Sequence, residues 1–389
     1  MDRCNDDLFP SKLRIHDPQE VSWARAELWE TLSMSPPRGP PSAPTAQPVS
    51  LHRHEMEQLS TASENGGVKA SLKADGIRYL VLLTQWPAAM VPSGEPRAVA
   101  LMYDRALVPY EISVWAQPRH FERRTLLDGE LVRRTGGDET HDLLWLAFDI
   151  IMEAGKRVDH LHYDRRLNRL HTLLDAADPL PVEEQVANGR IAVVNHDTSL
   201  KLMVKPYVDM FDIRSLWESR HHAGFNYDGI LFTPIAEAAR FGKHTSMFKW
   251  KSRHTIDVWV ARKAKRERGG DTREWIIKVL QRRRVVVASE AKAPILTVNS
   301  HPLYLALVST FALDGIMDDP ASSEEGLVLE CSMEVRPEQG LVELYPIRHR
   351  TDKTHPNSIV TIESTIENVL DHIEVEDLIN SIEGSSASR

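Results

Sequence analysis

Short apolar blocks, separated by polar turns, set the pattern of the first two thirds of this chain. Four of these blocks are rich in leucine, β-branched and aromatic residues, and they predict buried or half-buried strands. They are residues 79–83 (YLVLL), 98–103 (AVALMY), 125–132 (TLLDGELV) and 143–151 (LLWLAFDII). We therefore expect a strand-rich region from about residue 68 to residue 250.

Other segments repeat apolar residues at helical spacing. Residues 18–32 start with a proline, which favours a short helix. Residues 165–177 and 212–222 are expected to form helices on the surface of the sheet, and residues 361–383 a helix near the C-terminus. The last segment, 384–389 (GSSASR), is predicted to be a disordered tail.

A change of character after Lys251 indicates a second domain. The segment that begins TIDVWVARK has apolar alternation on either side of Gly269 and Gly270, which predicts a β-hairpin with those glycines at its turn. Further strands are expected at 326–335 and 340–350. Several short strands in so short a region suit a small barrel of the oligonucleotide-binding (OB) type.

The chain is thus expected to be an α+β protein of antiparallel sheets with flanking helices, followed by a C-terminal OB-fold β-barrel. Its length of 389 residues accommodates two domains. The expected organisation is an N-terminal helix with a proline-rich linker (1–45), a main domain (46–252), an OB-fold domain (253–360), a helix over 361–383 that packs back on the main domain, and the tail (384–389).

Composition narrows the function classes without naming one. A hydrophobic fraction of 42% and a charged fraction of 26% are typical of a globular protein, and no apolar run approaches the roughly 20 residues that span a bilayer. An amino terminus without an apolar core disfavours secretion, and two cysteines exclude a disulfide framework or a cysteine-rich zinc module. A net charge of -9 disfavours a protein that grips a long duplex, so any contact with nucleic acid should be local.

The candidate chemistry begins at one lysine. In SLKADGIRY, Lys73 stands beside Asp75, Gly76 and Arg78, just before the first strong strand pattern. A turn with a solvated lysine explains this pattern when it occurs alone. A lysine that attacks a phosphate explains the pattern too. Such a lysine must first lose its proton, and a free lysine has a pKa of about 10.4. Nearby cations in a water-poor site lower that pKa.

Other local patterns accompany Lys73 along the chain. Each alone has an ordinary explanation, such as a turn at Asp-Gly or a solvated strand face. They contribute Glu130 from LLDGELV, Phe148 from LAFDII, Lys205 from LMVKPYV, Asp228 and Leu231 from YDGILFTP, Lys249 and Lys251 from MFKWK, and Arg350, Asp352 and Lys353 from RHRTDKTHPN. Lys249 and Lys251 are expected on one face of a strand, with Trp250 on the other.

In this order the segments resemble those of the covalent nucleotidyltransferase superfamily of DNA ligases, RNA ligases and mRNA capping enzymes. Within it the chain most resembles the mRNA guanylyltransferases. KADGIRY resembles the nucleophile motif, and AQPVS (46–50) resembles the lead-in of capping enzymes. KWK followed by TID, and the ending RTDKTHPN, are more specific than the nucleophile motif, which the whole superfamily shares. The resemblance extends from about residue 47 to about residue 358.

The resemblance implies a role for each candidate. Catalytic roles fall to Lys73 as the nucleophile, Arg78, Glu130, Asp228, Lys249, Lys251, Arg350, Asp352 and Lys353, and nucleotide binding falls to Asp75, Gly76, Phe148, Lys205 and Leu231. Phe148 would stack on the base above Leu231, and Lys205 would read guanine. Arg350, Asp352 and Lys353 would orient the leaving pyrophosphate when the domains close.

A divalent metal is the expected cofactor. Glu130 and Asp228 offer hard carboxylate oxygens, which Mg²⁺ and Mn²⁺ prefer. GTP is the expected substrate.

The function implied is that of a GTP:RNA guanylyltransferase, which transfers GMP through a lysyl-N-GMP intermediate to the 5′-diphosphate end of RNA and so forms the mRNA cap. An ATP-dependent polynucleotide ligase would share Lys73, Glu130 and Lys251, but QPVS and the pairing of KWK with TID disfavour it. A non-catalytic RNA-end-binding subunit is the second alternative. It is disfavoured because none of the expected catalytic residues is missing.

Partners and location are inferred from that function. The sequence has no cysteine-phosphatase loop and no glycine-rich methyltransferase segment, so an RNA triphosphatase and a cap methyltransferase are expected on other chains. RNA polymerase is a further candidate partner, and no membrane is expected. The expected location is the nucleus, with a viral or cytoplasmic site of transcription as the alternative.

Overall fold

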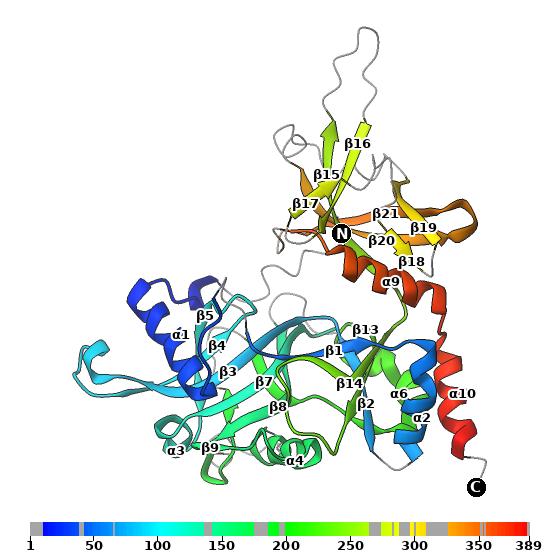
Figure 1. The fold of residues 1–389 in the computed structure, drawn as a ribbon. Coiled ribbons are helices and arrows are strands. Elements are labelled where there is room, and N and C mark those ends of the chain that lie inside the picture. The colour runs from blue at the N-terminus through cyan, green and yellow to red at the C-terminus, as the bar shows by residue number, and fades with distance from the viewer. Residues whose placement is uncertain are drawn as a thin grey trace. The chain divides into compact units, whose positions relative to one another are not determined.

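The structure of the protein, a computed structural model, describes residues 11–38, 43–64, 67–135, 142–174, 186–193, 199–263, 274–281, 284–287, 296–298, 301–308, 326–350, 353 and 355–386. Their contacts divide the chain into two compact units (Figure 1). Unit 1 comprises the described residues of 1–49, 58–250 and 381–389, and unit 2 those of 50–57 and 251–380. Helices and curled sheets are both present, which confirms the predicted α+β class.

Unit 1 is built on two β-sheets. The strands of the larger sheet are, in spatial order, β11 (Ser199–Val204), β8 (Asp142–Glu153), β7 (Thr125–Arg133), β3 (Ile77–Trp86), β4 (Arg97–Tyr103) and β5 (Pro109–Ile112), with β9 (Lys156–Arg157) on β8. The smaller sheet has the order β1 (Ala46–Ser50), β14 (Gly242–Lys251), β13 (Tyr227–Pro234), β2 (Val68–Ala74) and β12 (Val208–Asp209). A short pair joins β6 (Val114–Trp115) to β10 (Ala192–Val193).

The helices of the described residues complete the two units. The α-helices are α1 (Pro18–Leu32), α2 (Met56–Glu64), α3 (Pro118–Glu122), α4 (Tyr163–Leu174), α6 (Ile213–Glu218), α9 (Ile359–Asp371) and α10 (Val375–Ser386). Short 3-10 helices are η2 (Ser11–Leu13), η3 (Arg53–Glu55), η4 (Ala88–Met90), η5 (Met210–Asp212), η6 (Ser219–His222) and η7 (Pro337–Gln339). In the described part of the chain, no helix combines the length and the apolar character that crossing a membrane requires.

The two faces of β3 support two different cores, because alternate side chains of a strand point to opposite sides. Leu80 and Leu82 pack with Leu28 of α1, whereas Val81 and Leu83 lie in the core that α4 covers (Figure 1). All four of the strands predicted between residues 79 and 151 are present, as parts of β3, β4, β7 and β8.

The first helix forms where the sequence predicts it. Asp17 caps α1, since its Oδ1 accepts hydrogen bonds from the backbone N–H groups of Gln19 (2.8 Å) and Glu20 (3.0 Å). Ser33, in the left-handed conformation with φ of 54°, ends the helix. The prediction for residues 18–32 is confirmed.

The helix predicted over 165–177 corresponds to α4, which starts two residues earlier, while residues 175–177 lie outside the described residues. The helix predicted over 212–222 is replaced by α6 and the 3-10 helix η6.

Unit 2 is a single curled sheet with a helix against it (Figure 1). Its spatial order is β17 (Arg284–Val287), β16 (Glu274–Gln281), β15 (Thr255–Lys263), β20 (Leu327–Arg336), β21 (Leu341–His349), β19 (His301–Leu307) and β18 (Leu296–Val298). The predicted hairpin is the antiparallel pair β15–β16, although Gly269 and Gly270 lie outside the described residues. The identification as an OB-fold stays a prediction.

The C-terminal helical pattern forms two helices. His372, with φ of 46°, ends α9 in the left-handed conformation, and α10 follows. Ile359, Ile362 and Ile366 of α9 lie in the core of unit 2, whereas only the last part of α10 belongs to unit 1. Because α10 continues to Ser386, the start of the segment predicted as a disordered tail is helical.

Residues 50–57 join unit 2 although they are distant in sequence. His52 Nδ1 lies 2.8 Å from Asp371 Oδ2. Arg53 donates to the carbonyl oxygens of Asp371 (3.0 Å) and His372 (2.9 Å), and to Asp377 Oδ2 (3.1 Å). We call this set of contacts the N-terminal clasp.

Candidate functional site

Lys73 lies near the end of β2, and β3 begins at Ile77 after a short turn, so the strand predicted to follow Lys73 is present, whereas β2 was not predicted. The earlier strand was missed because VKASLKA is short and rich in small residues. Lys73 pairs in register with Gly229 of β13, and its Nζ donates to Asp228 Oδ1 at 2.7 Å. Both side chains are about a quarter exposed, at 24% and 27%. A lysine and a carboxylate from distant segments therefore meet at a partly buried position.

The residues after Lys73 form the turn into β3. A Cβ at Gly76 would lie 2.3 Å from the carbonyl oxygen of Leu131, so only glycine fits where the turn passes β7. Asp75 is exposed and its backbone N–H donates to the carbonyl of Asn226 at 2.8 Å. The Asp-Gly pair thus has a structural reason at this position.

Two of the predicted site residues occupy β-bulges. Along β13, Tyr227 pairs with Ala74 and Gly229 with Lys73, so the register of the two strands skips Asp228. Along β8, Ala147 pairs with Gly129 and Asp149 with Asp128, so the register skips Phe148 in the same way. A bulge re-aims a side chain, and bulges are enriched next to active sites.

Arg78 links several candidate segments. Its guanidinium binds Asp128 through Nε to Oδ1 (2.9 Å) and Nη2 to Oδ2 (2.5 Å), and Nη1 donates to the carbonyl of Ala46 (2.5 Å). It also lies over the ring of Phe148, 4.9 Å from the centroid. Burial alone would lower the pKa of Arg78, but Asp128, with Glu130 and Asp149 nearby, raises it. Arg78 is therefore a permanent cation held against an aromatic ring.

Glu130 lies beside Arg78 in the β3–β7 register. Burial raises its pKa, although Lys73, Lys205 and Arg78 act in the opposite direction. The raised pKa means that the ionised carboxylate is held where water does not solvate it well.

Lys205 is buried, with 4% of its surface exposed. It follows β11, and its backbone N–H donates to the carbonyl of Ala147 at 2.7 Å. Burial lowers its pKa to about 8, partly opposed by Glu130, and its Nζ lies 5.8 Å from the ring centroid of Tyr207. A buried ammonium group with a lowered pKa is typical of a functional site.

The remaining candidates of the smaller sheet lie on the faces that the alternation of side chains along a strand gives them. Leu231 pairs with Ser71 of β2 and shares the face of Lys73 and Gly229. Lys249 and Lys251 are half-buried near the end of β14, while Trp250 between them is buried, as predicted. Lys249 belongs to unit 1 and Lys251 begins the second segment of unit 2.

Arg350 and Lys353 are placed in unit 2, where they share one carboxylate. Asp257 of β15 lies 3.1 Å from Arg350 Nη1 through Oδ1 and contacts Lys353 Nζ through Oδ2. Asn357 fixes the backbone of Asp257, since its Oδ1 accepts from the Asp257 N–H (2.8 Å) and its own N–H donates to the Asp257 carbonyl (2.8 Å). Asp352 lies outside the described residues.

Sequence reasoning assigned no role to several charged partners of this site, including Asp128, Asp257 and Arg166 of α4. Arg166 had a detectable signal, because it shares the apolar face of its helix with Tyr163 and Leu170, where a charged residue is unexpected. Asp257 belongs to the TID segment, but a single aspartate in a strand does not reveal its partners.

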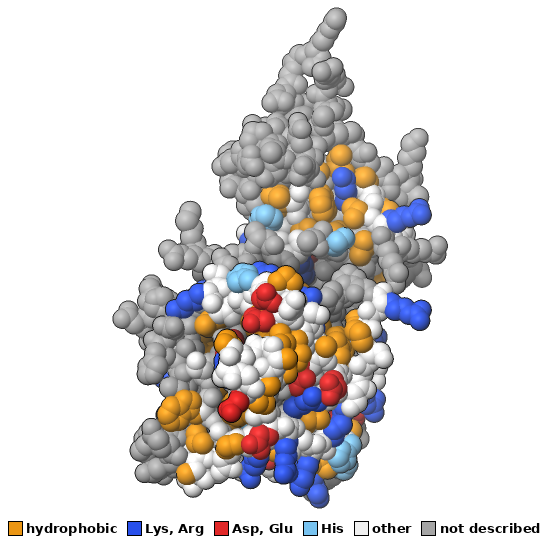
Figure 2. Space-filling model, turned by 90° about the vertical axis from the view of Figure 1, so that its left-hand side faces the viewer, with side chains coloured by type: hydrophobic (Ala, Val, Ile, Leu, Met, Phe, Trp, Pro, Cys, Tyr) orange, Lys and Arg blue, Asp and Glu red, His pale blue; other side chains and the backbone are white. Residues whose placement is uncertain are grey.

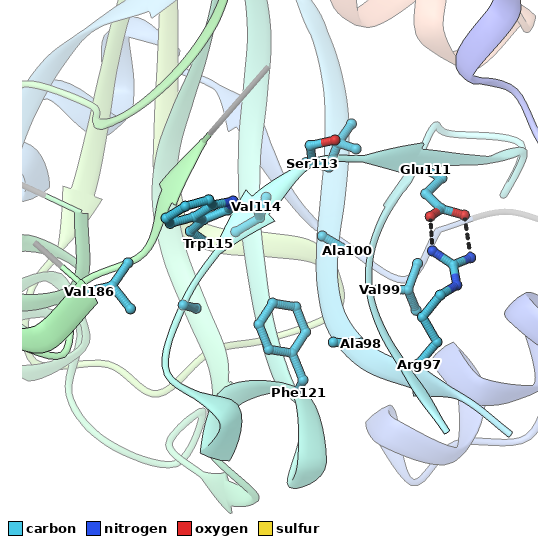
Figure 3. A pocket seen from close by; sticks show the side chains of 12 residues that line it. Arg97, Ala98, Val99, Ala100, Glu111, Ser113, Val114, Trp115, Phe121 and Val186 are labelled. Carbon is cyan, nitrogen blue, oxygen red and sulfur yellow. Dashed lines mark hydrogen bonds and ion pairs between the residues drawn. The ribbon is translucent and has the colours of Figure 1, made fainter. Parts of the chain in front are cut away.

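A pocket of about 380 Å³ lies elsewhere in unit 1, at the sheet edge formed by β5 (Figure 3). Val114, Trp115 and Phe121 line it, and the ion pair of Arg97 with Glu111 stands at its rim (Figure 3). Its described lining shares no residue with the site around Lys73. On the face seen in Figure 2, acidic and basic side chains are interspersed over unit 1.

Lys73, with Arg78, Glu130, Lys205 and Asp228 around it, is the arrangement expected of a covalent nucleotidyltransferase. Comparison with known proteins gives independent evidence on the class of enzyme. A family model described as "mRNA capping enzyme, catalytic domain" matches residues 13–253, and the chain belongs to this family. The family predicted from the sequence is confirmed.

Curated relatives agree with the family match. The chain is 29% identical over 224 residues to an mRNA-capping enzyme of Danio rerio, which covers 55% of this chain and 33% of the relative. It is 25% identical over 230 residues to an mRNA-capping enzyme subunit alpha of Schizosaccharomyces pombe, which covers 57% of this chain and 54% of the relative. The chain thus matches about a third and about half of the length of these relatives.

Solved structures with some likeness include DNA ligases. A mycobacterial DNA ligase D complexed with ATP covers 80% of this chain and 96% of its own, with a TM-score of 0.37 and 15% identity. The ATP-dependent DNA ligase of bacteriophage T7 covers 79% and 98%, with a TM-score of 0.35 and 14% identity.

Proposed function

We propose that this chain is an mRNA guanylyltransferase that carries GMP on Lys73. The observation that supports this most is the 2.7 Å contact between Lys73 Nζ and Asp228, in a chain of the capping enzyme family. Lys73 must lose a proton before it attacks, and Asp228 is an acceptor already in contact with it. The amine then forms a bond to the α-phosphorus of GTP, the bond from that phosphorus to the bridging oxygen breaks, and pyrophosphate leaves.

The second half of the reaction returns the enzyme to its starting state. A terminal phosphate oxygen of 5′-diphosphate RNA attacks the same phosphorus, and the phosphorus–nitrogen bond breaks. The Lys73 amine regains a proton, and the RNA carries a 5′-5′ linked GMP. Splitting one difficult transfer into two steps is the advantage of a covalent intermediate.

The nucleotide base is assigned to Phe148, Leu231 and Lys205. Phe148 would offer a stacking surface, with Leu231 on the other side of the base. Lys205, with a pKa of about 8, is mostly charged at neutral pH and donates hydrogen bonds only. Guanine presents an acceptor oxygen where adenine presents an amino donor, so a buried donor at this position favours GTP.

The phosphates are assigned to the cations. Arg78 would hold the ribose or phosphate, and Lys251 would reach the α-phosphate with Lys249 nearby. Arg350, Asp352 and Lys353 of the OB-type domain would orient pyrophosphate. Fixed positive charge stabilises the anionic transition state.

Glu130 and Asp228 fit a divalent metal. Both interact electrostatically with Lys205, and both offer hard oxygen ligands. Within the described residues no group of three or more His, Cys, Asp or Glu side chains could hold a metal ion, so the site fits an ion held by one or two carboxylates together with substrate phosphates. Mg²⁺ or Mn²⁺ bound there would neutralise phosphate charge.

The proposed function also sets the biological partners. An RNA triphosphatase must supply the 5′-diphosphate end, and a cap methyltransferase would consume the product, so both are expected on other chains. RNA polymerase is a candidate for bringing the transcript. The relatives named above are eukaryotic, and we propose the nucleus as the place of action.

One labelling experiment tests this proposal. The protein is incubated with α-labelled GTP or ATP and Mg²⁺ or Mn²⁺, denatured, and assayed for an acid-labile labelled adduct, and 5′-diphosphate RNA is then added. Labelling by GTP with transfer to RNA supports the proposal. Labelling by ATP alone would make the chain a ligase, and no adduct from either nucleotide would favour a non-catalytic RNA-end-binding subunit.

A further inference from the structure

The first turn of α4 contacts the middle of β8, at Phe148 and Asp149. Tyr163 Oη donates to the carbonyl of Phe148 at 2.7 Å. Arg166, one turn later, binds the neighbouring Asp149 through Nε to Oδ1 (2.7 Å) and Nη2 to Oδ2 (3.1 Å). Two side chains of one helix therefore fix two consecutive residues at and beside the bulge.

The Arg166 guanidinium is buried and makes several further contacts besides its ion pair with Asp149. Its side chain is 3% exposed, and Nη1 donates to the carbonyl oxygens of Leu161 (2.5 Å) and Glu237 (3.0 Å). Its guanidinium carbon also lies 5.3 Å from the ring centroid of Tyr163. A planar fork with this many fixed partners defines a position as well as a charge.

The pair of Arg166 with Asp149 continues into the candidate site. Asp149 pairs across the strands with Asp128, which holds Arg78 in the same bidentate way. Burial raises the pKa of Asp149, and the neighbouring Asp128 adds to that effect, whereas Arg166 opposes it. The four side chains form a line of charges, Arg78, Asp128, Asp149 and Arg166, with the Phe148 ring beside Arg78.

We propose that Arg166 is a positioning residue, which acts through Asp149 to hold the Phe148 ring and the Arg78 guanidinium where they bind the nucleotide. Tyr163 contributes to the same task through the Phe148 carbonyl. This inference rests on the proposed function, because it assigns Phe148 and Arg78 to nucleotide binding. In this proposal Arg166 and Tyr163 act through Asp149 and the Phe148 carbonyl and have no contact of their own with the base or the phosphates.

The bulge explains why such support is needed. Phe148 lacks a cross-strand partner, so the sheet alone does not fix its orientation. Without Arg166, Asp149 would be a buried carboxylate beside Asp128 with no cation of its own. Repulsion between the two carboxylates would then disturb the Asp128–Arg78 pair.

The test compares Arg166→Lys with Arg157→Lys. Arg157 is a matched control in the same unit, because it binds Asp159 through both ends of its fork and donates to the carbonyl of Leu32 at 2.5 Å. Lysine keeps the charge in both variants but cannot form the fork. The measurements are the GTP concentration that gives half-maximal adduct formation, the maximal rate, and the melting temperature.

We expect Arg166→Lys to raise the half-saturating GTP concentration between about 10- and 100-fold, as small misplacements near a reacting centre do. Arg157→Lys should leave it unchanged while lowering the melting temperature. An unchanged GTP dependence in Arg166→Lys, or equal changes in both variants in proportion to their loss of stability, would overturn the inference.

A second variant keeps the inference testable if Arg166→Lys does not fold. Tyr163→Phe removes only the hydroxyl that holds the Phe148 carbonyl, and we expect it to raise the half-saturating GTP concentration by a smaller factor. No change would contradict the inference. Absence of any adduct in the unmodified protein would instead contradict the proposed function, so the two failures are distinguishable.

Discussion

Two groups of charged side chains, one in each unit, differ in what shifts their pKa values. In unit 1, burial raises the pKa of Glu130 and lowers that of Lys205 to about 8. In unit 2, the carboxylate of Asp257 contacts both Arg350 and Lys353. Although burial would raise the pKa of Glu330, hydrogen bonds from Arg348 and Thr255 lower it. Burial therefore sets the direction of the pKa shifts of Glu130 and Lys205, whereas hydrogen bonds and ion pairs set that of Glu330.

This difference distinguishes charged groups that cost the folded protein stability from charged groups that stabilise it. A shifted pKa is a difference in free energy between the folded and unfolded chain. Glu130 and Lys205 are less stable as ions in the folded protein, whereas ionised Glu330 is more stable there. Functional sites commonly sacrifice stability in this way, so the cluster of unit 1 is where we expect the reaction.

The largest expected effect is that of removing the nucleophile. Lys73→Ala should abolish the labelled adduct with GTP, because the amine that carries GMP is gone. The control is Lys69→Ala, on the same strand and face, whose exposed pair with Asp209 is worth at most about 1 kcal/mol. A labelled Lys73→Ala protein would show that another residue carries the nucleotide.

Breaking the paired cluster of unit 2 should have a large effect on stability. Asp257→Asn leaves Arg350 and Lys353 without this carboxylate, and we expect a loss of about 3 kcal/mol in the free energy of unfolding. Glu334→Gln, which breaks an exposed pair with Arg336, should lose at most about 1 kcal/mol. Chemical denaturation of both variants measures the difference, and similar losses would argue against the distinction.

Crowding the site of unit 1 should have an intermediate effect. A Cβ at Gly129 would lie 2.5 Å from the Trp145 ring and 2.7 Å from the carbonyl of Leu146. Gly129→Ala should therefore lower the free energy of unfolding by about 1–3 kcal/mol. Gly384→Ala, where a Cβ meets nothing within 4 Å in α10, should stabilise by up to about 1 kcal/mol. A Gly129→Ala protein as stable as the unmodified protein would show that Trp145 has room to shift.

The smallest effect is a difference in pH dependence between two carboxylates. The raised pKa of Glu130 means that its charge costs stability above that pKa, and that the cost disappears as pH falls through it. Glu130→Gln should therefore melt a few degrees higher at neutral pH, and its advantage should shrink on acidification. For Glu330, whose pKa is lowered, the stabilisation is present at neutral pH and is lost as pH falls below its ordinary value.

Glu330→Gln should accordingly melt lower at neutral pH, and the difference should vanish in acid. Melting temperatures of both variants from neutral pH to about pH 3 test the pair of expectations. Parallel pH profiles would contradict the contrast between the two units.

Local signals in the sequence were enough for much of the fold. The apolar blocks gave the four strands around β3 because a short continuous apolar run within one segment is itself the signal of a buried strand. The proline start and periodicity gave α1 in full. The ordered motifs gave the family, which the family match over residues 13–253 confirms.

Features that depend on pairing were beyond the sequence. The bulges at Phe148 and Asp228 are set by the register of two strands together, and no residue type marks them. The break between α9 and α10 depends on the left-handed conformation of His372, which interrupts a continuous apolar pattern. The roles of the candidate residues stay predictions until the labelling experiment is done.

The N-terminal clasp has a practical consequence for dissecting the protein. Residues 50–57 complete unit 2, since His52 and Arg53 satisfy Asp371, His372 and Asp377. A fragment cut at residue 251 would lose the hydrogen bonds that His52 and Arg53 make to these acceptors and expose a surface that the intact chain covers. A soluble second unit would therefore be obtained by adding the peptide 50–57 back, fused or in trans, and its rescue of solubility would measure the strength of the clasp.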